Sequence, residues 1–143
     1  MTRRQNSKSM RAHPADFSVE DALRHKEIPI RPRYAECDPM GVVHHSVYPV
    51  WFEMGRTEML RGDGGSYRDL ENAGIFLVVA DLAIRFRSPA RYDDDLLLRT
   101  HLLEGGRARI RHGYELLGPD GSILATATTT IACIDAAGNL KPI

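Results

Sequence analysis

The residue best placed to do chemistry is Asp38, in the polar, turn-rich stretch ECDPMGVVHHS at residues 36–46. The chain that follows, residues 47–60, is mostly apolar and predicts a helix of about 21 Å. The first turn of a helix offers free backbone N–H groups and the positive end of its dipole. Such donors can hold a carbonyl oxygen that becomes an oxyanion, and a thiolate can leave without a strong acid. A carboxylate beside a helix start therefore suits thioester hydrolysis, although such an aspartate can also be only a turn or cap residue.

The predicted helix must be buried, because the first half of its sequence is apolar on nearly every side. Its apolar residues are Val47, Tyr48, Val50, Trp51, Phe52 and Met54. Pro49 is tolerated because it falls in the first turn. A second, short helix is predicted at residues 66–72 and should stop at Gly74.

The rest of the chain reads as strands. Residues 78–88 alternate, with Val78, Ala80, Leu82, Ile84 and Phe86 on one face. Further strands are predicted at 96–103, 107–117 and 123–134. An earlier strand begins near residue 28 and is confined to a sheet edge by Pro29 and Pro32. One long helix against one antiparallel sheet is an α+β layout, and its open face and edges predict pairing with a second copy.

Length and composition place the protein among ordinary single domains. The 143 residues carry 19 basic and 19 acidic side chains, so no global charge favours nucleic acid or an anionic membrane. No apolar run approaches the roughly 18 residues of a membrane span. The two cysteines, Cys37 and Cys133, are expected to be reduced thiols in a cytoplasmic protein.

Residues 1–26 are predicted to form an N-terminal tail, and residues 27–143 the folded domain. The tail lacks a catalytic pattern and is expected to be dispensable for chemistry. Ser18 and the acidic residues after it resemble a capping box, which predicts a short helix from Val19 to His25.

A resemblance to a known family adds to this reading. The residues that carry it are Asp38, Gly41, Val42, Val43, His45, Tyr48, Phe52, Glu53, Arg56, Thr57 and Glu58, with a second stretch FRSPARYDDDL at 86–96. From about residue 28 onward the chain resembles the 4-hydroxybenzoyl-CoA thioesterase family. The resemblance implies a hotdog fold, with about five antiparallel strands wrapped around one long helix, assembled as a dimer or tetramer.

The same resemblance implies an acyl-CoA thioesterase in which Asp38 acts as nucleophile or general base. The backbone N–H of His45 is expected to polarise the thioester carbonyl, and its side chain to position water or Asp38. The residues expected to contact substrate are Gly41, Val42, His44, Val47, Tyr48, Ser88, Arg91 and Arg107. Arg91 and Arg107 would meet the phosphates of coenzyme A, in part from a neighbouring subunit. The segment 93–95 is expected to be a solvated turn.

Two departures limit what can be transferred from the family. His44 stands where relatives often have an aromatic residue, and Val47 where they often have a small polar one, so the acyl group is left open. No cofactor and no metal are expected, because His44, His45 and Glu53 lack a ligand spacing. Acyl carrier protein could present the thioester in place of coenzyme A. Two other functions stay open, namely a hotdog hydratase or dehydratase and a non-catalytic acyl-CoA-binding protein.

Overall fold

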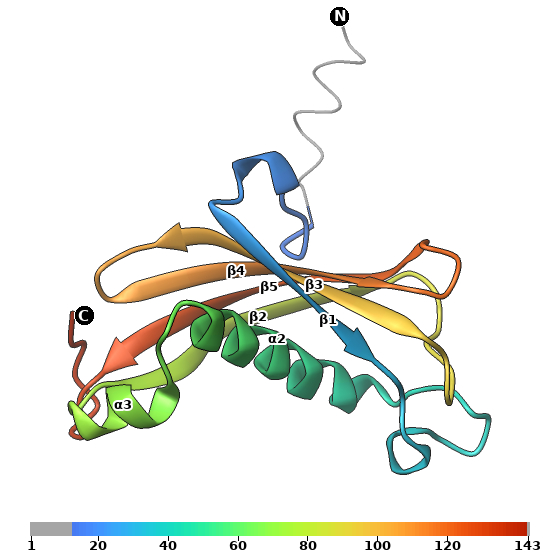
Figure 1. Ribbon diagram of the computed structural model, residues 1–143, viewed down its shortest axis with the longest axis horizontal. Helices are drawn as coiled ribbons and strands as arrows, with labels where there is room; N and C mark the ends of the chain where they lie inside the picture. The colour runs from blue at the N-terminus through green and yellow to red at the C-terminus, as the bar shows by residue number, and fades with distance from the viewer. Residues whose placement is uncertain (1–12, 143) are drawn as a thin grey trace, which may run out of the picture.

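One curved antiparallel sheet and one long helix form the molecule (Figure 1). The computed structural model describes residues 13–142. The sheet has five strands in the order β1-β3-β4-β5-β2. Their bounds are Arg24–Ile30 for β1, Phe76–Phe86 for β2, Leu96–Gly105 for β3, Arg109–Leu117 for β4 and Ile123–Ile134 for β5. The helices are α2, Tyr48–Gly62, and α3, Tyr67–Asn72, preceded by 3-10 turns η1 at Val19–Asp21, η2 at Tyr34–Glu36 and η3 at His45–Val47. This architecture confirms the predicted α+β fold.

Helix α2 lies along one face of the sheet and supplies much of the core. Tyr48, Trp51 and Phe52 are each at most 2% exposed, and the Phe52 ring stacks on Tyr114 of β4 at 4.5 Å between centroids. The sequence predicted that the first half of this helix is buried on nearly every side. Within one chain that prediction is wrong for one side, because Val50 and Met54 are about half exposed. One side of α2 therefore presents apolar surface to solvent.

Gly55 allows α2 to approach the sheet closely. A Cβ atom there would lie 2.1 Å from Thr100 Oγ1 and 3.0 Å from Leu98 Cδ2, both on β3. Any side chain at this position would push the helix away from the sheet. The closeness of α2 to β3 fixes the place of the helix start, where the chemistry is expected.

Strand β2 departs from the predicted alternation. Its pairing with β5 shifts between Val79 and Asp81, which marks a β-bulge at Ala80. Val79, before the bulge, and Leu82, after it, both line the groove beside α2. The predicted face of Val78, Ala80, Leu82, Ile84 and Phe86 is therefore wrong for its first two members, because the bulge changes the parity of the strand.

The N-terminal segment differs most from the prediction. The predicted helix begins at Val19, but it is a 3-10 turn that ends at Asp21, and β1 begins at Arg24, inside the segment assigned to the tail. The described part of the tail crosses the sheet on the side opposite α2 (Figure 1). There Thr128 donates to Pro14 O at 2.7 Å, and Phe17 occupies the space where Gly113 lacks a Cβ.

Residues 1–12 lie outside the described residues, so the dispensability of the tail stays a prediction. Its test should spare residues 13–17, because they pack on the sheet. Within residues 13–142, no helix is long and apolar enough to cross a membrane.

Candidate active site

Asp38 begins a tight turn that its own side chain stabilises. Asp38 N donates to Val42 O and Gly41 N donates to Asp38 O, both at 2.9 Å. Asp38 Oδ1 accepts from Met40 N at 2.9 Å and from Val42 N at 3.2 Å. Gly41 has φ of 77°, a conformation that glycine adopts without strain. Within residues 13–142, Oδ2 of Asp38 has no hydrogen-bond donor from the protein, so one carboxylate oxygen is free.

The second stretch of the family resemblance packs directly against this turn. Val43 N donates to Ala90 O at 2.8 Å, and Tyr92 N donates to Gly41 O at 3.0 Å. Val42 and Arg91 form an isolated antiparallel bridge between them. The fold therefore brings Arg91 next to the turn formed by Asp38, Gly41 and Val42, from which it is distant along the chain.

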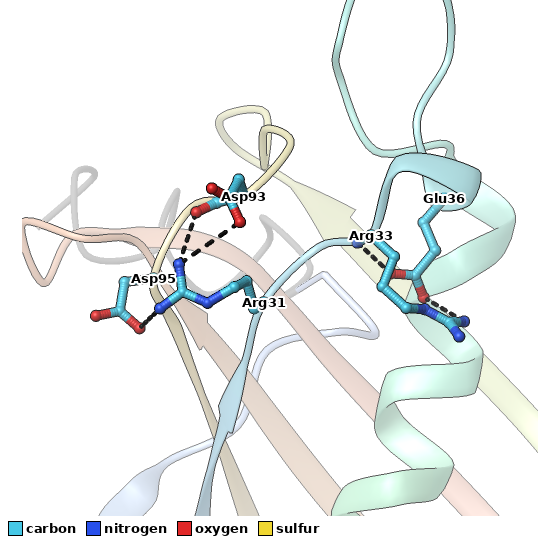
Figure 2. Close-up of polar contacts among 5 residues, drawn as sticks. All are labelled: Arg31, Arg33, Glu36, Asp93 and Asp95. Carbon is cyan, nitrogen blue, oxygen red and sulfur yellow. Dashed lines mark hydrogen bonds and ion pairs between the residues drawn. The ribbon is translucent and has the colours of Figure 1, made fainter.

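A buried glutamate, not anticipated from the sequence, ties the same loop to α2. Glu36 is 9% exposed and accepts from Arg33 N at 2.8 Å and Arg33 Nη2 at 3.2 Å (Figure 2). It also accepts from Trp51 Nε1 of α2 at 3.2 Å. Burial alone would raise the pKa of Glu36, but these donors and the Arg33 charge hold it below its ordinary value. A buried tryptophan needs an acceptor for its indole N–H. Trp51 in the predicted buried helix was therefore the one indication in the sequence that an acceptor lies nearby.

Arg31 fastens the other side of the loop (Figure 2). Its Nη1 donates to Asp93 O at 2.9 Å, and its Nη2 lies 3.4 Å from Asp95 Oδ1. Segment 93–95 is exposed, as expected for a solvated turn, but it is also held by ion pairs with Arg31. Asp93 has φ of 64°, in the left-handed region that few residues other than glycine adopt.

The start of the helical segment leaves one backbone donor free. His44 N donates to Glu36 O and Val47 N to His44 O, both at 3.0 Å, and Ser46 N donates to His44 Nδ1 at 3.2 Å. Within the described residues no acceptor pairs with His45 N. Cys37 and Val43 pair at the base of the Asp38 turn, two residues before His45. The turn that carries the free Oδ2 of Asp38 is therefore followed, two residues after Val43, by the free backbone N–H of His45.

Residues 32–143 match the family model described as the thioesterase-like superfamily. The chain belongs to the thioesterase-like superfamily. The matched region includes Asp38, the segment 90–92 and both α-helices.

Relatives within the thioesterase-like superfamily agree. The putative acyl-CoA thioesterase YneP of Bacillus subtilis is 35% identical over 118 residues, which are 82% of this chain and 83% of that protein. The acyl-CoA thioesterase YbgC of Haemophilus influenzae is 35% identical over 116 residues, covering 80% and 84%. The crystal structure of a DHNA-CoA thioesterase from Staphylococcus aureus is 30% identical with a TM-score of 0.79, covering 82% of this chain and 80% of that one. Together they confirm the expected hotdog fold and the expected enzyme class, a thioester hydrolase.

The other predicted site residues differ in how far they are buried. His44, His45 and Ser88 are exposed, and the rings of the two histidines lie 4.3 Å apart. Tyr48 is buried against Trp51 and Phe86, and burial raises the pKa of its phenol, a rise partly offset by a hydrogen bond with the Ala90 backbone. Val47 packs against the same core.

Arg107 stands apart from the rest. It follows β3, and the ten residues of that strand span about 30 Å between the Asp38 end of the sheet and the β3–β4 turn. Within one chain Arg107 therefore does not reach the Asp38 turn.

Cys37, next to Asp38, is not prepared to act as a nucleophile. Burial, together with the negative charges of Glu36 and Asp38, raises the pKa of its thiol. A reactive cysteine needs a lowered pKa, because the thiolate is the nucleophile. Asp38 remains the better candidate for the reacting group at this turn.

A groove that is apolar near the helix start runs beside α2. It has a volume of about 230 Å³. Its lining residues are Pro49, Val50, Phe52, Glu53 and Arg56 of α2, Val79 and Leu82 of β2, and Thr129 of β5. Because it begins in the first turn of α2, it is suitably placed for an apolar group attached to a carbonyl held there.

Proposed function

We propose that the protein hydrolyses an acyl-CoA thioester to the free acid and coenzyme A, with Asp38 as nucleophile or general base. The observation that supports this most is the free Oδ2 of Asp38 in a turn that leads into the free N–H of His45. The names of the relatives support the substrate class, and a place in the 4-hydroxybenzoyl-CoA thioesterase branch belongs to the same proposal. The reaction takes place in the cytoplasm, with acyl carrier protein as the alternative carrier.

In the nucleophilic route, the thioester oxygen accepts a hydrogen bond from His45 N–H and gains negative charge as Oδ2 attacks the carbonyl carbon. Collapse of this intermediate breaks the carbon–sulfur bond, releases the coenzyme A thiolate and leaves an acyl-aspartyl anhydride. Water then cleaves the anhydride and restores the Asp38 carboxylate. In the general-base route, Oδ2 instead takes a proton from the water that attacks the carbonyl.

A second copy of the chain completes the site. β2 is an edge strand of eleven residues, and Val79, Leu82 and Phe86 on it are 43–50% exposed. Together with Val50 and Met54 they form an apolar face that a monomer leaves in water. A neighbouring copy that covers this face would close the groove. The β3–β4 turn of that copy would also bring its Arg107 to the coenzyme A bound at the Asp38 turn of the first copy.

Light scattering on wild type and Leu82→Lys tests the assembly. We expect wild type to be a dimer or tetramer, and the variant to be smaller and less active. An active wild-type monomer at assay concentration contradicts the proposal of a shared site.

Thiol release from a panel of short-chain, long-chain and aromatic acyl-CoA esters tests the function. Steady release from at least one member is expected. Hydration of an enoyl-CoA without thiol release would identify the hydratase alternative. Saturable binding without any turnover would identify the non-catalytic alternative.

A further inference from the structure

A cavity of about 400 Å³ lies at the end of α2 that is remote from Asp38. It is bounded by the last turns of α2, the starts of β1 and β4, and the β3–β4 turn. Its apolar wall is formed by Met59, Leu60, Leu77, Leu102 and Ile110. Small-molecule sites in proteins commonly have volumes of roughly 300–1,000 Å³, so the cavity is large enough to hold a small ligand.

Arg56 of α2 brings a buried positive charge to this cavity. Its side chain is 8% exposed, and its Nη1 donates to Tyr114 Oη at 3.1 Å, which lies 2.6 Å from Thr129 Oγ1. Burial lowers the pKa of Arg56, but the phenols of Tyr114 and Tyr67 more than offset this, so the group stays charged. In the part of the chain that the structure describes, no carboxylate lies within 4 Å of it, Glu53 included.

His112 adds a buried polar group, one of whose ring nitrogens has no partner among the described residues. It lines the same cavity, is 8% exposed, and its Nδ1 has no hydrogen-bond partner among residues 13–142. Burial and the nearby Arg56 charge lower its pKa to about 4, so the ring is neutral at pH 7. A buried polar atom left unpaired destabilises the fold unless something pairs with it.

Positive charge is in excess around the cavity. Its lining residues include Arg24, Arg56 and Arg107 but a single carboxylate, Asp63. Asp63 already pairs with Arg24 at 2.9 Å. The lining carboxylate therefore compensates neither Arg56 nor Arg107, and most of the remaining wall is apolar.

We propose that this cavity binds a small organic acid, with its carboxylate on Arg56 and its apolar body against Met59, Leu102 and Ile110. An inorganic anion would use the charge and leave the apolar wall in water, and an uncharged apolar molecule would leave Arg56 without a counter-ion. Within one chain the cavity is separate from the Asp38 turn, because α2 is about 22 Å long and its buried Trp51 and Phe52 lie between the two ends. Arg56 also lines the groove beside α2, whereas Leu102 lines the cavity and not the groove, so a substitution of Leu102 tells the two apart. The inference depends on the cavity and not on the proposed thioesterase function.

Titration of the full-length protein with sodium octanoate, followed by amide NMR and calorimetry, tests the site. We expect saturable binding that shifts the amide signals of Gly105 and Gly106, which line the cavity, and leaves Gly41 unmoved. Octan-1-ol and inorganic phosphate should each bind at least about tenfold more weakly, the loss typical of one charge-assisted contact. Absence of saturation, equal binding of octanol or phosphate, or shifts centred on Gly41 would each overturn the proposal.

Two variants locate the contact. Arg56→Met should weaken octanoate at least about tenfold, whereas Arg61→Met, which removes an exposed charge from the same helix, should not change it. Leu102→Trp fills the cavity and leaves the Arg56–Tyr114 hydrogen bond in place. It should also weaken octanoate binding, and it is the variant to use if Arg56→Met does not fold. Unchanged octanoate affinity in a folded Arg56→Met or Leu102→Trp protein would refute the site.

Discussion

Two turns of this protein have the same construction and opposite surroundings. Asp38 Oδ1 accepts from the N–H groups two and four residues later, and Asp135 Oδ1 does the same with Ala137 and Asn139. In each turn the fourth residue is a glycine with positive φ, Gly41 at 77° and Gly138 at 89°. A bridge closes each base, between Cys37 and Val43 and between Ile134 and Leu140.

The difference lies in what adjoins each turn. The Asp38 turn is hydrogen-bonded to segment 90–92, is tied to α2 through Glu36 and Trp51, and leads into the free N–H of His45. The Asp135 turn follows the last strand and has none of these neighbours. An aspartate turn therefore becomes a candidate for catalysis through its neighbours, because the geometry of the Asp38 turn is shared with the Asp135 turn, to which we assign no chemistry.

The largest expected effect comes from removing the charge of each aspartate. Asp38→Asn should reduce turnover at least roughly 100-fold while substrate still binds, because the lost interaction belongs to the transition state. Asp135→Asn should leave turnover within about twofold, and both variants should lose a similar stability of about 1 kcal/mol, as for a missing cap. Turnover, substrate affinity and thermal unfolding are measured on the same preparations.

Near-wild-type turnover in Asp38→Asn, or an equal loss of turnover in Asp135→Asn, would contradict a catalytic role that belongs to Asp38 alone. Single-turnover hydrolysis in ¹⁸O-water then distinguishes the two routes. Label in the Asp38 carboxylate indicates the anhydride route, and label only in the product acid indicates a general base.

The next largest effect is expected at Glu36, which links the Asp38 turn to Trp51 of α2. Glu36→Gln keeps the size of the side chain but removes the charge that holds Arg33 and the Trp51 indole. We expect a loss of about 2 kcal/mol in the free energy of unfolding, since hydrogen bonds to charged groups contribute roughly 1.5–3 kcal/mol, together with lower turnover. Glu58→Gln, which changes a carboxylate of α2 that pairs with Arg61 at the surface, is the control and should lose less than about 1 kcal/mol.

Acid should reproduce this effect without mutation. The pKa of Glu36 is lowered in the folded protein, so its stabilisation is complete above the unfolded value near 4.3 and is lost as the pH falls through the folded pKa. Denaturant unfolding followed from pH 6 to pH 3 should therefore show a steeper loss in wild type than in Glu36→Gln. Parallel curves for the two proteins would show that the Glu36 carboxylate does not support the loop.

The smallest effect should be the same in both turns. Gly41→Ala and Gly138→Ala meet no neighbouring atom within 4 Å, so each should lose only the cost of positive φ, about 1–2 kcal/mol. Chemical denaturation measures both. A loss at Gly41 much greater than at Gly138 would mean that the contacts with Ala90 and Tyr92 make the first turn less tolerant of backbone movement.

Local patterns predicted most of the fold. The last strand was expected at residues 123–134 and occupies Ile123–Ile134, and the helix expected at 47–60 occupies Tyr48–Gly62. The polar stretch around Asp38 was recognisable as a turn before a helix because it contains Pro39 and Gly41. These features depend on residues that are close together in the chain.

The features that were missed depend on contacts between distant residues. No local pattern indicates that Glu36 pairs with Trp51, that Arg31 holds Asp93 and Asp95, or that Phe17 packs on Gly113. Arg107 and Arg91 were both expected at the phosphates of coenzyme A because of the family resemblance, in part from a neighbouring subunit, and that stays a prediction. Strand β3 places them at opposite ends of the sheet.

The bulge at Ala80 sets the phase between the two halves of β2. Deleting this single residue would restore a regular ladder with β5 and leave Val79 and Leu82 on the groove side, because they pair with Ile131 and Thr129, which are two residues apart on β5. The inward face of β2 is therefore set by its register with β5, and the loss of one residue at Ala80 would leave that face intact.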